Sequence, residues 1–229
     1  MEPSTAFRPL LFDRARRCLL AAAGMLLFSF ANCLQLQACI GLSPWFSLNE
    51  GLARTFPITY GQASLLISAL IVVVDLLLRE PIGLGTLINA VVGGLGSDLF
   101  LQLNWIPAQT FFPCQLAMLL AGIVLICISQ YIYMRAGLSC GPWDAFLVAL
   151  GRKLPQISIG KINLLLLTAV QVVALLLGGP FGAGTFITIF FTGTVMDLVF
   201  KVLHFEPRSV RHENLAQTAA AFRAALKNR

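Results

Sequence analysis

The chain has 229 residues, of which 58% are hydrophobic and only 11% are charged, and its mean hydropathy is +0.83. Soluble domains carry about 25% charged residues, so this composition excludes a soluble domain, and the scarcity of charges argues against a nucleic-acid partner. Nearly charge-free windows recur along the chain, and a helix needs about 20 apolar residues to cross a bilayer core. The composition therefore predicts an all-α polytopic membrane protein whose partner is the lipid bilayer.

The predicted elements form two halves of the same design. Each half contains a span, a short helix that Pro-Trp opens, a second span, and a third span that follows a glycine-rich break. In the first half these elements are residues 18–38, 44–55, 60–78 and 86–103. In the second half they are residues 113–135, 142–154, 162–177 and 186–203. The Pro-Trp helices are too short to cross a bilayer, so we expect them to be re-entrant or interfacial.

The two halves align as an internal repeat. Pro44-Trp45 aligns with Pro142-Trp143, the Pro-x-Gly-x-Gly-Thr break at 81–86 aligns with that at 180–185, and Asp98 aligns with Asp197. The shift between the copies grows by one residue after the short helix. Self-similarity over this length is typical of a duplicated structural unit. We call this correspondence between the two copies the repeat alignment.

The repeat alignment defines the domain organisation. Residues 18–103 form the first membrane repeat and residues 113–203 the second, with a loop at 104–112 between them. Basic segments at 1–17 and 204–229 flank the two repeats.

The distribution of charge predicts the orientation. Three crossings per repeat would invert the second copy relative to the first. Lys and Arg gather before the first span and after the last, whereas the 104–112 loop has no charged residue. Positive charge beside spans favours the cytoplasmic side, which predicts cytoplasmic termini and an outer loop. If the Pro-Trp helices crossed the membrane, the copies would be parallel and this pattern would break.

Motifs in the second half resemble those of a known family. Gly141-Pro142-Trp143-Asp144, Ser158-Ile159-Gly160, and Gly182–Thr185 with Asp197 resemble the YczE/YyaS/YitT family of bacterial integral membrane proteins, and the match covers most of 20–203. The first half departs from this pattern, since Phe46 stands where the second half has Asp144. The resemblance implies a bacterial inner-membrane protein and supplies no substrate.

Asp98 and Asp197 are the first candidate site residues. Each is predicted to lie a little past the middle of its span, where a charged residue costs at least ~2.5 kcal/mol and normally faces a partner or a water-filled cavity. The alternative is a structural carboxylate that caps a neighbouring helix. Asp75 is assigned instead to a local ion pair with Arg79, four residues further on.

The glycine-rich breaks supply four more candidates: Gly85, Gly184, Thr86 and Thr185. A break of this kind brings backbone N–H groups to a helix start, where the helix dipole attracts anions and a threonine can cap. We expect non-helical backbone at 83–85 and 182–184. The alternative is a tight turn that allows close helix packing.

Trp45, Trp143 and Asp144 complete the candidate binding residues. Both tryptophans follow a proline at a helix start, so they could form the wall or the gate of a binding cavity, or simply anchor the helix at the membrane interface. Asp144 lies in the first turn of its helix, where it complements the dipole and could also contact a solute.

Inverted repeats with broken helices are typical of secondary transporters. The sequence therefore predicts an inner-membrane transporter of a small molecule or ion, with ion or proton coupling through Asp98 and Asp197. One alternative is a substrate-capturing subunit of an ATP-driven vitamin importer, and another is a non-transporting assembly or regulatory factor. No motif of an enzyme, metal site or cofactor site is found. The sequence leaves open whether the protein forms a homo-oligomer.

The topology is testable by labelling single cysteines from one side of the membrane. With Gln109→Cys in the loop and Ser209→Cys in the C-terminal segment, a membrane-impermeant reagent added to intact cells should label only the first. Labelling of both positions from the same side would contradict the predicted orientation.

Overall fold

A computed structural model describes residues 4–80, 82–139, 141–157, 159–205 and 220. Side chains are described over the same ranges except at 4–11, 148, 159–161, 163 and 197. Most of the predicted C-terminal basic segment, 206–219 and 221–229, thus lies outside the described residues.

The described chain is all-helical, which confirms the predicted class. In chain order the helices are α1 (Ser4–Ala38), α2 (Pro44–Thr55), α3 (Tyr60–Leu77), α4 (Leu84–Leu103), α5 (Phe112–Arg135), α6 (Pro142–Lys153), α7 (Ile159–Leu176) and α8 (Ala183–Val202). Proline occupies the first turn of α2, α5 and α6. A backbone N–H in the first turn has no acceptor within the helix, so proline, which lacks this group, is tolerated there. Helix α3 begins with a capping box between Thr59 and Gln62.

Five helices are long and apolar enough to cross a membrane: 12–38 of α1, and α3, α4, α5 and α8. The described apolar part of α7, Leu164–Leu176, is shorter, so the sixth predicted span stays a prediction. Helix α1 begins at Ser4 rather than near residue 18, so the basic segment before the first span continues its helix.

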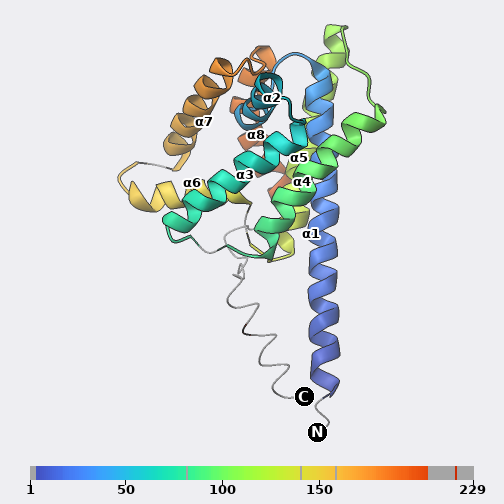
Figure 1. The fold of residues 1–229 in the computed structure, drawn as a ribbon, viewed down its shortest axis with the longest axis vertical. Coiled ribbons are helices and arrows are strands. Elements are labelled where there is room, and N and C mark those ends of the chain that lie inside the picture. The colour runs from blue at the N-terminus through green and yellow to red at the C-terminus, as the bar shows by residue number, and fades with distance from the viewer. Residues whose placement is uncertain (1–3, 81, 140, 158, 206–219, 221–229) are drawn as a thin grey trace.

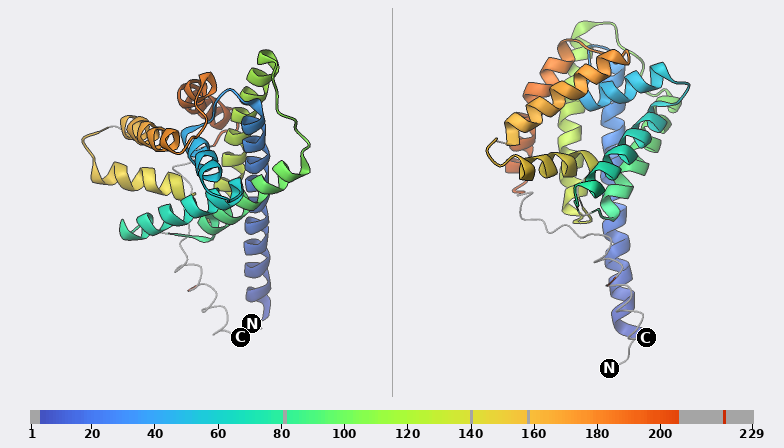
Figure 2. Two further views of the ribbon diagram at one scale, coloured as in Figure 1. Left: turned by 45° about the horizontal axis from the view of Figure 1, so that its top comes forward. Right: turned by 60° about the vertical axis from the view of Figure 1, so that its left-hand side comes forward.

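Helices α1 and α5 pack against each other and run antiparallel (Figures 1 and 2). Two glycines allow this close approach. A Cβ on Gly24 would lie 3.0 Å from the backbone nitrogen of Tyr133, and a Cβ on Gly122 would lie 3.0 Å from the carbonyl oxygen of Ala31. Helix α4 packs against α1, and α8 packs against α5.

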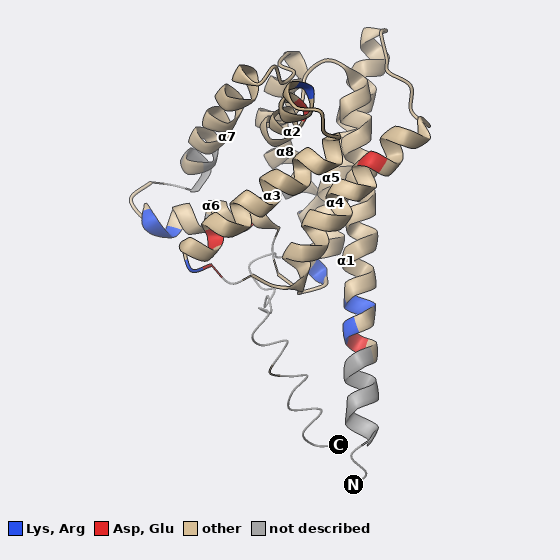
Figure 3. Ribbon diagram, in the orientation of Figure 1, with Lys and Arg blue, Asp and Glu red and all other residues tan. Residues whose placement is uncertain are grey.

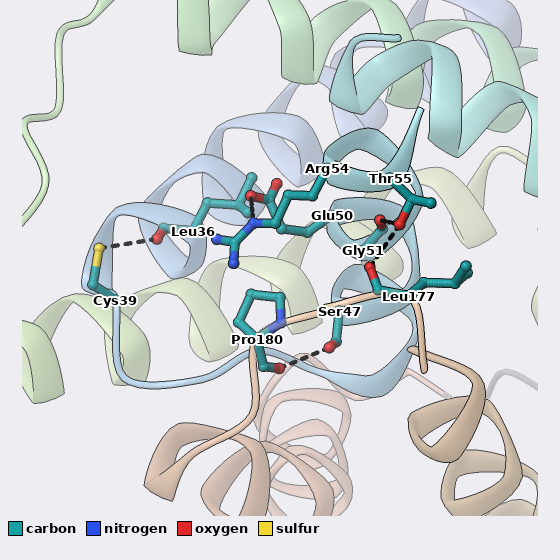
Figure 4. Close-up of polar contacts among 9 residues, drawn as sticks. All are labelled: Leu36, Cys39, Ser47, Glu50, Gly51, Arg54, Thr55, Leu177 and Pro180. Atoms are coloured by element: carbon teal, nitrogen blue, oxygen red, sulfur yellow. Dashed lines mark hydrogen bonds and ion pairs between the residues drawn. The ribbon is translucent and has the colours of Figure 1, made fainter. Parts of the chain in front are cut away.

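The short helix α2 docks onto the loop between α7 and α8 (Figure 4). The Ser47 hydroxyl donates to the carbonyl oxygen of Pro180 at 2.7 Å, and the Thr55 hydroxyl lies 2.9 Å from the carbonyl oxygen of Leu177. A Cβ on Gly51 would lie 2.9 Å from the nitrogen of Gly179. Helix α2 is therefore fastened to the loop before α8 along its whole length.

Helix α6 has the matching place beside α3. Its Arg152 forms an ion pair with Glu80, in the loop between α3 and α4, at an N–O distance of 3.0 Å. Each Pro-Trp helix thus contacts the break loop of the other half of the chain.

The two glycine-rich breaks are shorter than the sequence analysis predicted. Gly83 and Gly182 are extended N-cap residues, but Gly85 and Gly184 lie in the first turns of α4 and α8. The expectation of non-helical backbone through Gly85 and Gly184 was wrong. The helices begin earlier because carbonyl groups from the other half of the chain accept their first free N–H groups.

The pair α3–α4 and the pair α7–α8 differ in packing. Helix α3 lies against α4, and a Cβ on Gly94 would lie 2.8 Å from the carbonyl oxygen of Gly61. Gly193 takes the place of Gly94 in the repeat alignment, yet a Cβ there meets no described atom within 4 Å. Among the described residues, the first pair is closed at its glycine contact and the second makes no such contact at Gly193.

Charged residues occupy the ends of the bundle (Figure 3). Most described Lys and Arg residues gather toward the end from which α1 projects, and α2 carries Arg54 at the opposite end. The side of the membrane on which this end lies stays a prediction.

The difference between the helix pairs predicts unequal effects of the same substitution. Gly94→Ala should lower the apparent melting temperature of the purified protein, because overpacking a closed contact costs about 1–3 kcal/mol. Gly193→Ala is the matched control and should leave the melting temperature unchanged. Equal losses for the two variants would contradict the open packing of α7 and α8.

Candidate functional site

A cavity of about 270 Å³ lies between α1, α2, α5, α6, α7 and α8. This is near the lower end of the size range of small-molecule sites. Its wall contains Trp45, Trp143 and Asp144, so the structure brings three of the predicted site residues together around one space. We call it the large cavity.

The two tryptophans stack on one another at the centre of the protein. Their ring centroids are 5.3 Å apart and their planes differ by 13°. Each follows the proline that opens its short helix, so the helix starts aim both indoles at the same point. Phe28 and Phe46 pack beside the pair. The pair is thus a packed element of the core as well as part of the cavity wall.

Three polar side chains of the large cavity have an atom without a hydrogen-bond partner among the described residues: Gln35 Oε1, Gln130 Oε1 and Trp143 Nε1. Gln35 is only 1% exposed. A buried polar group left unpaired costs about 1–3 kcal/mol, and native proteins leave few of them. Three such atoms around one cavity indicate a place for a polar ligand or for water.

Asp144 is the charged residue of the wall. The Tyr133 hydroxyl donates to its Oδ2 at 2.8 Å. Burial raises the pKa of the Asp144 carboxyl above its ordinary value, and the hydrogen bond from Tyr133 partly offsets this rise.

A second cavity of only about 10 Å³, room for about one water molecule, lies on the other side of Trp143. We call it the small cavity. The walls of the two cavities correspond in the repeat alignment. Each residue that lines the small cavity has a counterpart in the other repeat. Wherever the side chain of that counterpart is described, it lines the large cavity.

The small cavity is closed by a hydrogen-bonded polar network. Asn32 donates from Nδ2 to the Tyr60 hydroxyl at 2.8 Å and to the Ser97 hydroxyl at 3.2 Å. Phe46 stands in the wall where the large cavity has Asp144. Asn49, fully buried here, has neither side-chain polar atom paired among the described residues.

The four break residues hold the two halves together and do not line either cavity. The Gly85 N–H donates to the carbonyl oxygen of Leu138 at 3.0 Å, and the Gly184 N–H donates to that of Ile40 at 2.7 Å. Gly85 corresponds to Gly184 and Leu138 to Ile40 in the repeat alignment, so each half makes the same contact with the other.

The break threonines extend this contact. The Thr86 N–H donates to the Ser139 hydroxyl at 3.0 Å. Thr185 lies against Gly41, the counterpart of Ser139, and a Cβ on Gly41 would lie 2.8 Å from the Thr185 hydroxyl. Ser139 and Gly41 both have positive φ, +129° and +113°. The same turn conformation therefore receives each break.

Asp98 lies outside both cavity walls and caps α3. Its carboxylate accepts hydrogen bonds from the Gly61 N–H at 2.6 Å and from the Thr59 hydroxyl. These contacts favour the capping role that the sequence analysis gave as the alternative. The side chain of Asp197 lies outside the described residues.

The expected ion pair between Asp75 and Arg79 is absent from the described contacts. Asp75 is fully buried, and neither carboxylate oxygen has a described hydrogen-bond partner. Arg79 ends the helix with a φ of +63° and is exposed. The positive φ turns the chain at Arg79, so the two residues no longer follow helical i, i+4 geometry.

The sequence analysis missed Gln35 and Gln130. Both are uncharged amides inside spans, and their hydrophilic side chains are the one signal that could have singled them out. Polar residues are common at membrane helix interfaces, so this signal alone does not separate a cavity wall from a helix contact.

Residues 15–201 match the family of unknown function DUF6198. The chain belongs to this family. It is 32% identical over 177 residues to the uncharacterized membrane protein YczE of Bacillus subtilis, covering 76% of this chain and 80% of YczE. It is 29% identical over 195 residues to the uncharacterized protein YyaS of the same organism, covering 82% and 95% of the two chains.

An uncharacterized protein of Haemophilus influenzae is 28% identical over 164 residues, with coverage of 72% and 74%. No solved structure matches the chain. The family confirms the resemblance drawn from the motifs. Together with the apolar helices, it identifies the chain as a multi-pass membrane protein.

The environment of Asp144 predicts a pH dependence of stability. Because burial raises its pKa in the folded state, its contribution to stability is complete below the unfolded pKa and is lost as pH rises through the raised value. As pH rises through this range, the apparent melting temperature should therefore fall less for Asp144→Asn than for the wild type. Glu50→Gln, which removes a carboxylate paired with Arg54 on α2, is the control. Identical pH curves for wild type and Asp144→Asn would contradict the prediction.

Proposed function

We propose that this protein is a small-solute transporter of the bacterial inner membrane. It is built from two inverted repeats, and one of the two cavities is open while the other is closed. The observation that supports this most is the pair of corresponding cavities with unequal volumes, about 270 Å³ and about 10 Å³. In a transporter of inverted repeats, one half adopts the open form while the other is closed.

Reciprocal contacts support the inverted arrangement. A two-fold axis turns each contact between residue i of one copy and residue j of the other into its symmetry-related pair. The Gly85–Leu138 and Gly184–Ile40 hydrogen bonds obey this rule. Trp45 and Trp143 occupy the same position in the two copies and stack on each other, as residues on the axis itself would.

The present conformation has its second repeat open and its first repeat closed. Gly61 and Gly94 are in contact across α3 and α4, and Asp98 fastens the start of α3 to α4. Gly193 instead faces the large cavity with no neighbour within 4 Å among the described residues. With the orientation predicted from the charges, the large cavity belongs to the cytoplasmic half, and this is an inward-facing state.

In the proposed cycle the second repeat closes as α7 approaches α8 at Gly193, and the first repeat opens as α3 parts from α4. Opening the first repeat would break the Asp98 cap and the Asn32 network and expose the Asn49 amide. The polar side chains of the small cavity would then line an outward-facing vestibule. Asp144 replaces Asp98 as the acid best placed to couple a proton to solute movement.

The test is solute flux into proteoliposomes that contain the purified protein, screened with a metabolite library. Gly193→Leu should fold normally and lose about tenfold in flux. Its side chain fills the space into which α7 must move, and overpacking there would disfavour the closed state by about 1–3 kcal/mol. Phe190→Leu, on the exposed surface of the same helix, is the control and should keep wild-type flux.

Three outcomes would refute the proposal. The first is the absence of flux for every solute from protein that is folded and inserted, which would favour an assembly or regulatory factor. The second is a Gly193→Leu variant that transports at the wild-type rate. Copurification of an ATPase subunit, with flux that requires ATP, would identify a substrate-capturing subunit instead.

A further inference from the structure

From the wall of the large cavity we infer the chemical class of its ligand: a small planar organic cation, an aromatic ring that carries a protonated amine. This inference rests on the proposed function, since it takes the large cavity as the solute site. It is carried by three features of the wall, namely its charge, its aromatic surfaces and its unpaired polar atoms.

The one ionisable side chain among the described residues of the wall is an acid. Asp144 lines the large cavity, and among its described lining residues there is no Lys or Arg. Asp144 is partly buried, removal of a carboxylate from water is costly unless a positive group or hydrogen bonds compensate it, and its described side-chain hydrogen bond is the one from Tyr133. A cationic ligand would supply the missing charge. A carboxylate or phosphate ligand would face Asp144 with no compensating cation in the described wall.

The aromatic surfaces match a flat cation. Trp45, Trp143, Phe28 and Phe46 line one side of the cavity, and tryptophan is the best partner for a cation over an aromatic face. The two indoles stack on each other, so each holds the other in place and little entropy is lost when a ligand packs against them. The cavity volume of about 270 Å³ suits a metabolite of one or two rings.

The unpaired polar atoms match the amine. The amide oxygens of Gln35 and Gln130 accept hydrogen bonds, as does Asp144, and an ionised carboxylate or phosphate group would donate none to them. An ammonium group offers three donors. Trp143 Nε1 adds a single donor, which can serve a ring nitrogen or a hydroxyl of the same ligand.

The experiment uses three probes of similar shape and different charge: tryptamine, indole and indole-3-acetate, which are cationic, neutral and anionic at pH 7. Their dissociation constants are measured by isothermal titration calorimetry on the purified full-length protein in lipid nanodiscs. Tryptamine should bind about tenfold more tightly than indole, because a desolvated cation–π contact and an ion pair both favour it. Indole-3-acetate should bind more weakly than indole.

Asp144→Asn should abolish the preference for tryptamine over indole. Retained indole binding also shows that the variant is folded. Glu50→Gln removes a carboxylate of α2 that does not line the cavity, and it should keep the preference.

Three outcomes would overturn the inference: indole-3-acetate binding as tightly as tryptamine, no binding of any probe, or an unchanged preference in Asp144→Asn. Binding is measured without a gradient, so its result is separate from that of the flux assay. A protein that binds tryptamine in this manner and moves no solute refutes the transport proposal alone.

Discussion

Backbone polar groups inside a bilayer have no water to satisfy them, and this constraint governs how the chain is assembled. Every break in a helix at membrane depth exposes N–H and C=O groups that must find partners within the protein. The break before α4 donates a hydrogen bond to the carbonyl oxygen of Leu138, in the turn before α6. The break before α8 donates one to the carbonyl oxygen of Ile40, in the turn before α2. Each half satisfies only part of its own break, through Gly83–Thr86 in one and Gly182–Thr185 in the other, and the N–H groups of Gly85 and Gly184 depend on the other half. The halves are therefore tied together by the same requirement that permits the breaks.

This exchange also positions the two indoles. Each turn that receives a break continues directly into Pro-Trp, so fixing the turn fixes the first residues of the short helix. Helix α2 is then held along its length by the loop before α8, and α6 by the ion pair between Arg152 and Glu80. The central aromatic pair is consequently set by backbone hydrogen bonds several residues away, rather than by its own packing alone.

Much of the fold could be predicted from the sequence because its signals are local. Apolar length and Pro-Trp starts placed helix boundaries such as Pro44 and Pro142 directly, and the duplicated motif identified equivalent residues in the two halves. The start of α1 was misplaced, because a basic segment says where charge lies and not whether its backbone is helical. The breaks were overestimated because their acceptors belong to the distant half of the chain.

The site was harder to predict for the same reason. Asp98 looked like an acid in mid-span, yet whether it faces a cavity or the start of α3 depends on how α3 crosses α4. Trp45, Trp143 and Asp144 were found because they accompany a recognisable helix start. Gln35 and Gln130 carry no such marker, and their role follows from three-dimensional packing that places both amides at one cavity.

The shared wall between the cavities bears on how such a protein could coexist with an energised membrane. Phe28, Phe46 and Trp143 line both cavities. Movement of these rings into one cavity would therefore enlarge only the other. We therefore expect that enlarging both cavities at once would disturb the stacked aromatic rings. If the protein transports a solute as proposed, a shared wall of this kind would disfavour a continuous aqueous path across the bilayer, and with it a leak of protons and other ions.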